Sequence, residues 1–222
     1  MGANDNLFVL VRHGQSITNS ANVFTGILDP PLTPTGELEA IGVGQFLLSG
    51  WTPPIAFDAC YTSPLVRASR SAELILDTLG QRPPVILDKA LLERDYGDLN
   101  GRNKAEVARE FGVERTEAWR RGYFDAPPNG ESLEQTANRA WAFFLAEMRP
   151  RLLRGEKVLC VTSGNTARGL VLRLEGLGED EIRKVELGTA ATRVYRFDEG
   201  GSIIERRLRL DEEGKEGHFV KP

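Results

Sequence analysis

Short apolar runs alternate with longer segments of helical periodicity along most of this 222-residue chain, and this alternation limits the folds open to it. The apolar runs predict strands near 7–11, 57–62, 85–87, 157–162, 193–197 and 203–210. Helical periodicity predicts helices near 34–49, 65–79, 103–111, 114–121, 131–154 and 166–174. Strands that alternate with helices are typical of a largely parallel sheet covered on both faces. We therefore expect a three-layer α/β/α sandwich with a mostly parallel central sheet of about six strands.

The segment near 92–130 interrupts the alternation, because it contains helical patterns but few strand signals. We interpret it as a helical insertion on the sheet. The whole chain, 1–222, is then expected to form a single domain, and residues 211–222 form a polar C-terminal tail. A chain of this length can bury a substantial core.

Composition excludes several classes of partner. The formal charge of −4 argues against a basic surface for nucleic acid or an anionic membrane. No apolar stretch has the length needed to span a bilayer, and residues 1–6 lack the features of a signal peptide. Cys60 and Cys160 lie in apolar runs without the spacing of a zinc or redox site. We expect a cytoplasmic protein that binds no metal, nucleic acid or membrane.

Polar and charged side chains follow four of the predicted strands. Arg12 and His13 end the first strand, Arg67 begins the helix after the second, Glu93 follows the third and Ser163 the fourth. Ligands of open α/β sheets bind at this edge. Neutral imidazole is a good nucleophile toward phosphorus, and the arginine fork matches phosphate oxygens. The pattern predicts phosphoryl transfer to His13, with Glu93 as proton donor and acceptor.

These residues belong to a pattern that resembles a known superfamily. Leu10–Ser16 (LVRHGQS) is similar to the signature of the histidine phosphatase superfamily. More narrowly, nearly the whole chain resembles the 2,3-bisphosphoglycerate-dependent phosphoglycerate mutases in their short bacterial form. The segments most specific to mutases are Glu93–Gly97 (ERDYG), Lys104 and Trp119–Arg121 (WRR).

The resemblance implies a role for each matched residue. His13 would be the phosphorylated nucleophile and Glu93 the proton donor and acceptor, while Arg12, Asn19 and Arg67 would hold the transferring phosphoryl group. The rest of the phosphoglycerate would be bound by Thr25, Gly26, Arg94, Tyr96, Lys104, Arg120, Arg121, Gly164 and Asn165. The resemblance also implies 2,3-bisphosphoglycerate as the cofactor that primes His13, a phosphorylated small-molecule substrate, and a homo-oligomer (dimer or tetramer).

The chain departs from the family pattern after the fourth predicted strand. Where the family carries His-Gly-Asn, this chain carries Ser163, Gly164 and Asn165. Loss of a transition-state donor lowers a rate by about 10²–10³. Ser163 can still donate a neutral hydrogen bond, so we expect slowed chemistry. The only other histidine, His218, is interpreted as a solvated residue of the tail.

Three functions remain open at this point. The first and favoured one is the interconversion of 3-phosphoglycerate and 2-phosphoglycerate in glycolysis and gluconeogenesis, slowed by Ser163. The second is a phosphatase on the same fold, and Lys104, Arg120 and Arg121 argue against a general one. The third is a catalytically impaired protein that binds phosphoglycerates. Glu93 argues against it, because a pure binder needs no proton shuttle.

Overall fold

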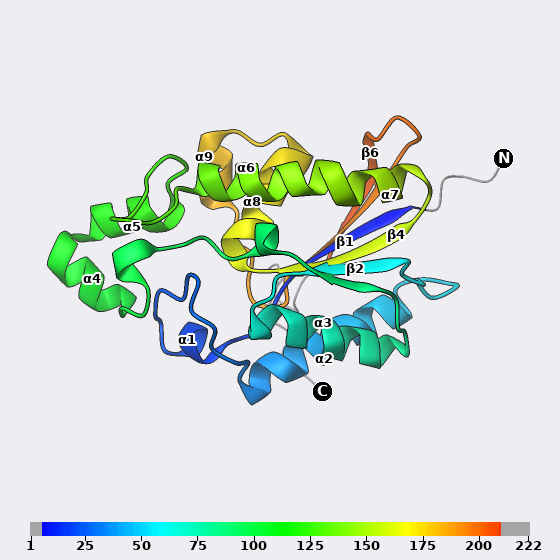
Figure 1. The fold of residues 1–222 in the computed structure, drawn as a ribbon, viewed down its shortest axis with the longest axis horizontal. Helices are drawn as coiled ribbons and strands as arrows, with labels where there is room; N and C mark the ends of the chain where they lie inside the picture. The colour runs from blue at the N-terminus through cyan, green and yellow to red at the C-terminus, as the bar shows by residue number, and fades with distance from the viewer. Residues whose placement is uncertain (1–5, 210–222) are drawn as a thin grey trace.

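One sheet runs through the computed structural model, which describes residues 6–209 (Figure 1). In those residues six strands are arranged in the order β3-β2-β4-β1-β5-β6. They are β1 (Leu7–Arg12), β2 (Ala59–Thr62), β3 (Val85–Leu87), β4 (Lys157–Thr162), β5 (Thr192–Phe197) and β6 (Ile203–Leu208). Strands β3, β2, β4 and β1 pair in parallel, and β5 and β6 continue the sheet antiparallel. The predicted six-stranded, mostly parallel sheet is confirmed.

Helices cover both faces of this sheet. They are α1 (Ile17–Ser20), α2 (Pro34–Ser49), α3 (Val66–Leu79), α4 (Lys104–Phe111), α5 (Val113–Arg121), α6 (Leu133–Phe143), α7 (Arg149–Leu153), α8 (Gly164–Glu175) and α9 (Glu179–Lys184). Short 3₁₀ turns occupy Lys89–Leu91 and Gly97–Leu99. Helix α2 begins where the sequence predicts, because the Thr33 hydroxyl accepts the N–H of Gly36 and Pro34 needs no partner in the first turn.

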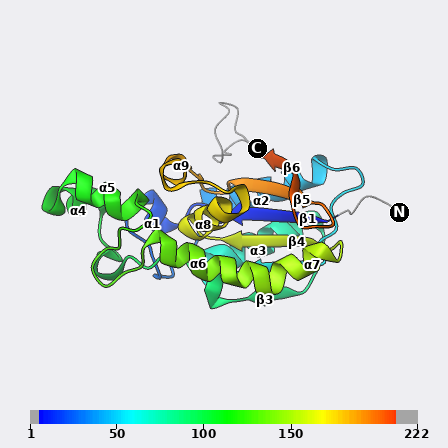
Figure 2. The ribbon, with the colours of Figure 1, turned by 90° about the horizontal axis from the view of Figure 1, so that it is seen from above.

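The helix predicted over 131–154 is interrupted by a π-helical turn, Phe144–Met148, between α6 and α7. The interruption precedes Pro150, whose missing N–H and bulky ring disturb the hydrogen bonds of the preceding turn. Seen from above, α6 and α7 still continue along nearly one line across the sheet (Figure 2).

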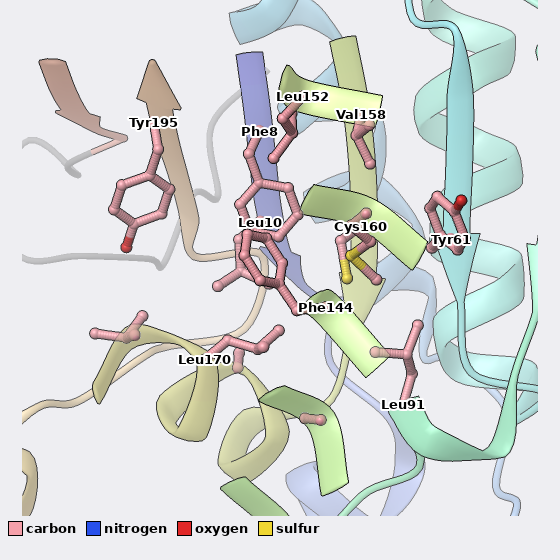
Figure 3. Packing of buried hydrophobic residues seen from close by; sticks show 14 of the residues in the cluster. Phe8, Leu10, Tyr61, Leu91, Phe144, Leu152, Val158, Cys160, Leu170 and Tyr195 are labelled. Carbon is pink, nitrogen blue, oxygen red and sulfur yellow. The ribbon is translucent and has the colours of Figure 1, made fainter. Parts of the chain in front are cut away.

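Alternating side chains of the central strand β1 feed two cores, one on each face of the sheet. Phe8 and Leu10 pack beneath α6, α7 and α8, where the rings of Phe8 and Phe144 lie 5.1 Å apart (Figure 3). Val9 and Val11 pack against α2 and α3 on the opposite face. The sheet is therefore fixed on both faces, which places the carboxyl ends of its parallel strands at one defined edge.

Residues 104–121, here called the α4–α5 segment, project beyond that edge together with α1 (Figure 1). Its helices α4 and α5 have a small core of their own, made by Phe24, Tyr96, Leu99, Val107 and Trp119. No helix within residues 6–209 is both long and apolar enough to cross a membrane. The predicted tail 211–222, with His218, lies outside the described residues.

Candidate active site

A cavity of about 270 Å³ opens at the carboxyl edge of the sheet, between the strand ends and the α4–α5 segment. It brings together all but two of the residues that the sequence predicts for the site. These are Arg12, His13, Asn19, Thr25, Gly26, Arg67, Glu93, Tyr96, Lys104, Arg120, Arg121, Gly164 and Asn165. Segments far apart in the sequence thus meet around one hollow.

His13 lies at the base of the cavity and is only 2% exposed. Its Nε2 is 3.2 Å from Nε of Arg67, and its Nδ1 is 2.6 Å from the carbonyl oxygen of Gly14. A guanidinium can only donate, so Nε2 must accept and Nδ1 must carry the proton. Burial, followed by the charges of Arg67 and Arg12, holds the pKa of His13 well below its ordinary value. His13 is therefore a neutral imidazole with a lone pair on Nε2, the form that attacks phosphorus.

The loop that carries His13 packs backbone to backbone against the start of α2. A Cβ atom on Gly14 would lie 2.0 Å from the carbonyl oxygen of Gly36, so this contact requires glycine. The next amide, of Gln15, donates to the buried carboxylate of Glu39 at 2.7 Å. These contacts fix the position of the nucleophile before any ligand arrives.

Two buried arginines flank His13. Arg67 is 1% exposed and donates to the carbonyl oxygens of Leu28 (2.6 Å) and Gly26 (2.9 Å). Arg12 donates to the carbonyl oxygen of Leu187 at 2.5 Å, and its buried Nε has no hydrogen-bond partner among residues 6–209. Burial lowers the pKa of both groups, yet an arginine stays charged at neutral pH. The pair presents positive charge where a phosphoryl group on His13 would lie.

Glu93 reaches the cavity from the loop that follows β3. Its Oε1 accepts the backbone N–H groups of Arg94 at 2.8 Å and of Asn165 at 3.1 Å. Asn165 lies in the first turn of α8, where the helix dipole favours a negative charge. The carboxylate is thus held in one orientation next to the reacting edge of the cavity, as a proton donor and acceptor requires.

The α4–α5 segment supplies a second group of cations on the cavity wall. Lys104 begins α4, and Arg120 and Arg121 end α5. Burial, together with the charges of Arg120 and Arg12, lowers the pKa of Lys104 from 10.5 to about 8. A ligand with two separated anionic groups could therefore contact the arginines beside His13 and these cations together.

An acidic residue competes for part of that second group. Glu186, in the loop after α9, accepts a hydrogen bond from Arg121 at 2.5 Å, and Glu117 lies 3.6 Å from the same guanidinium. Glu186 itself lines the cavity. Without ligand, Arg121 thus bridges the α4–α5 segment and the loop after α9.

Two predicted residues do not line the cavity. Ser163 is completely buried before α8, and its Oγ has no hydrogen-bond partner in the described part of the chain. Arg94 is also completely buried, and it donates to the backbone carbonyls of Glu131 (2.8 Å) and Asp125 (2.5 Å). The structure thus places Arg94 outside the cavity lining, where Nε and Nη2 join the loop of Glu93 to residues 125–131 after α5, while its buried Nη1 has no hydrogen-bond partner among residues 6–209.

Several lining residues were missed by the sequence analysis, and Arg168 is the most informative of them. The others are Val23, Phe24 and residues 185–188. Arg168 lies one helical turn after Gly164 on α8, a spacing that places both on one helix face and could have indicated it. The loop 185–188 carries no motif that points to a site. Residues 6–209 contain no group of three or more His, Cys, Asp or Glu that could hold a metal ion.

Comparison with known proteins shows the family to which the chain belongs. The sequence profile of the histidine phosphatase superfamily (branch 1) matches residues 8–208. The chain is 44% identical over 201 residues to a 2,3-bisphosphoglycerate-dependent phosphoglycerate mutase of Bartonella quintana, covering 90% of this chain and 96% of that one. A mutase of the same name from Azorhizobium caulinodans is 45% identical over 204 residues, covering 91% and 98%.

Solved structures show the same fold. A mycobacterial glucosyl-3-phosphoglycerate phosphatase superposes with a TM-score of 0.72 at 26% identity, covering 91% of this chain and 96% of that one. Bacillus stearothermophilus YhfR superposes with a TM-score of 0.78 at 24% identity, covering 96% and 98%. The chain belongs to the histidine phosphatase superfamily (branch 1) and, within it, to the family of the 2,3-bisphosphoglycerate-dependent phosphoglycerate mutases.

Proposed function

We propose that this protein interconverts 3-phosphoglycerate and 2-phosphoglycerate, in glycolysis and gluconeogenesis, through a phosphohistidine at His13. One observation carries the proposal: the cavity holds a neutral His13 between Arg12 and Arg67, and a separate group of cations shares the same hollow. A mutase must hold a ligand with two phosphates while each in turn faces the nucleophile, so it needs both groups. The curated relatives named as such mutases support the proposal.

The residues around His13 suit each step of the transfer. Nε2 of His13 attacks the phosphorus, Nδ1–H keeps its bond to Gly14, and Arg12 and Arg67 stabilise the charge on the phosphoryl oxygens. Glu93 takes the proton of the substrate hydroxyl as that oxygen attacks the phosphohistidine. It returns the proton to the leaving oxygen when His13 is phosphorylated again.

The cavity fits the bisphosphorylated cofactor that the family uses. The buried Nε atom of Arg12 has no partner among residues 6–209, although Arg12 lines the cavity. Unpaired buried donors of this kind suit an anionic ligand. When bound, 2,3-bisphosphoglycerate supplies the phosphoryl group that primes His13. Asn19, Thr25, Gly26 and the cations of the α4–α5 segment would contact the rest of it.

A phosphatase activity is the second candidate, and Ser163 favours it. By its resemblance to the mutase pattern, this chain has Ser163 in place of a histidine that would assist the transferring group, and the Ser163 hydroxyl is buried outside the cavity lining. Weaker hold on the phosphoryl group would give water more opportunity to take it. The likeness to a mycobacterial phosphatase shows that the fold accommodates such chemistry.

The deciding experiment follows 3-phosphoglycerate, 2-phosphoglycerate and released phosphate in one reaction primed with catalytic 2,3-bisphosphoglycerate. Isomerisation without phosphate release, absent in His13→Ala, is the expected result. Phosphate release with little isomerisation would assign the phosphatase function. Silence on both channels would leave a binding protein and overturn the proposal.

The proposal extends to the protein's organisation. We place it in the cytoplasm, as a single domain that forms a homo-oligomer, either a dimer or a tetramer. Resemblance to the mutase family supports each of these points. Gel filtration with light scattering measures the oligomeric state, and a monomer would contradict that part of the proposal.

A further inference from the structure

Three buried side chains form a hydrogen-bonded row in the cavity wall. Nη1 of Arg168 lies 3.1 Å from Oδ1 of Asn165, and Nδ2 of Asn165 lies 3.0 Å from the hydroxyl of Tyr96. The exposed fractions of Arg168, Asn165 and Tyr96 are 7%, 9% and 8%. All three residues line the cavity.

The direction of each bond in this row is fixed by chemistry. A guanidinium has no acceptor, so the atom of Asn165 that faces Arg168 must be its carbonyl oxygen. The amide nitrogen then faces Tyr96, and because this nitrogen only donates, the Tyr96 oxygen must accept.

We propose that Arg168 is a positioning residue that makes Tyr96 a hydrogen-bond donor to the anionic substrate. Because Asn165 presents a donor to the Tyr96 oxygen and not an acceptor, the Tyr96 O–H is left to donate elsewhere. No acceptor for that O–H is found in the described range, and the hydroxyl belongs to a residue of the cavity wall. A phosphate or carboxylate oxygen of the substrate is the acceptor that the proposed function brings there, and on that function this inference rests.

The neighbours of the row hold it still. Nη2 of Arg168 donates to the carbonyl oxygen of Ile182 at the end of α9, at 2.7 Å. The ring of Tyr96 packs 4.8 Å from the ring of Phe24, and the guanidinium carbon of Arg94 lies 5.2 Å from it. Rotation of the Asn165 amide would break its bonds at both ends. The donor direction at Tyr96 is therefore set before the substrate binds.

The test compares two neutral replacements of similar size, Arg168→Gln and Arg168→Met. Glutamine still offers an N–H to Asn165, whereas methionine does not, so the pair separates donation from charge. Because a hydrogen bond to a charged group is at stake, we expect Arg168→Met to weaken 3-phosphoglycerate binding about tenfold. Arg168→Gln should remain within about threefold of the unchanged protein. Calorimetric titration measures the Kd, and Arg173→Met on the exposed face of α8 is the control for loss of an arginine.

The second arm repeats both replacements in a Tyr96→Phe background. If Arg168 acts through the Tyr96 hydroxyl, Arg168→Gln and Arg168→Met then bind 3-phosphoglycerate equally well. The inference would be overturned if Arg168→Gln and Arg168→Met had equal Kd values with Tyr96 unchanged. It would also be overturned if the tenfold difference between them persisted in Tyr96→Phe. Thermal unfolding of each variant identifies any that fail to fold, and Arg168→Lys, which keeps the charge and the donor, is then compared with Arg168→Gln.

Failure of the proposed function is read from the unchanged protein alone. If it neither binds nor converts 3-phosphoglycerate, the mutase proposal is wrong, and the same comparison is made with inorganic phosphate as the titrant. A difference between Arg168→Gln and Arg168→Met that depends on Tyr96 would still support the row. If Arg168→Gln and Arg168→Met bind phosphate equally well, the proposed row is wrong.

Discussion

Burial lowers the pKa of two residues of the cavity, His13 and Lys104, with different consequences. It keeps His13 neutral, so that Nε2 carries an unprotonated lone pair. It also lowers the pKa of Lys104 to about 8, which puts the loss of a binding cation within reach of ordinary assay conditions. The first effect serves catalysis, and the second makes binding sensitive to alkali.

Substrate affinity should therefore fall above pH 8. Lys104 is charged below its lowered pKa and neutral above it, so an anionic ligand gains less from Lys104 as the pH rises. In a pH profile, kcat/KM of the unchanged protein declines above about pH 8, and Lys104→Arg, which stays charged, removes most of this decline. A decline of equal size in Lys104→Arg would assign it to another group.

Ser163 should limit the rate of transfer. Its buried Oγ makes no hydrogen bond among the described residues, so Ser163→Ala should change kcat less than about threefold. Ser163→His adds a ring donor next to Gly164, which lines the cavity, and should raise kcat by about tenfold or more. Steady-state kinetics measure both, with thermal unfolding to identify overpacking by the larger ring. A folded Ser163→His enzyme with unchanged kcat would contradict this account.

The sequence predicts the site residues that lie at strand ends, but not the cavity residues whose position depends on how helices pack against each other. Arg12 and His13 directly follow a buried strand, and parallel strands share one edge, so their meeting with Arg67 was predictable. Arg168 was overlooked although its spacing from Gly164 on α8 places both residues on one helix face, and its bond to the Ile182 carbonyl of α9 could not be read from the sequence. Arg94 shows the converse, since its neighbours in sequence indicate a site while its side chain lies outside the cavity lining.

At the scale of elements, one ion pair joins the α4–α5 segment to the loop after α9. Arg121 donates to Glu186, whose side chain is 71% exposed, and both residues line the cavity. A substrate anion that binds Arg121 must displace this carboxylate or share the guanidinium with it. Glu186, in the loop after α9, thus competes with the substrate for Arg121 of the α4–α5 segment.

Removal of that competition should strengthen binding. An exposed pair of this kind contributes about 0–1 kcal/mol, so Glu186→Gln should lower KM for 3-phosphoglycerate by about twofold to fivefold with kcat little changed. Glu179→Gln, on α9 and exposed, is the matched control for loss of one negative charge. An increase in KM on Glu186→Gln would mean that Glu186 orients Arg121 for the substrate.

Element boundaries were predictable where a local signal marks them. Thr33 and Pro34 start α2, and Gly50 follows its end, as expected. Helix α9 was missed because six residues are too few for a helical period to be read. The π-helical turn before α7 was missed because hydrophobic spacing does not distinguish it from a regular helical turn.

For the molecule as a whole, a buried neutral histidine makes folding sensitive to acid. The pKa of His13 is lowered in the folded state, while the unfolded chain titrates near 6.5. Below pH 6.5 the unfolded state binds a proton that the folded state does not, so stability is lost as the pH falls, by at most about 1.4 kcal/mol per pH unit. Above pH 6.5 His13 is neutral in both states, so it adds no further pH dependence to the free energy of unfolding.

The free energy of unfolding should consequently fall less steeply between pH 6.5 and about 5 in His13→Asn than in the unchanged protein. Urea unfolding at a series of pH values measures the difference. Titration of carboxylates affects both proteins alike and cancels in the comparison. Equal slopes for the two proteins would contradict a lowered pKa of His13 in the folded state.

The contact between Gly14 and Gly36 has a consequence for how such a protein can diverge. A side chain at either position would strike backbone about 2 Å away, so neither can change without the other segment moving. The wall of the cavity that carries Lys104, Arg121 and Glu186 lies outside this backbone contact. A lineage built on this geometry can acquire new substrates by altering that wall, while it inherits its nucleophile unchanged.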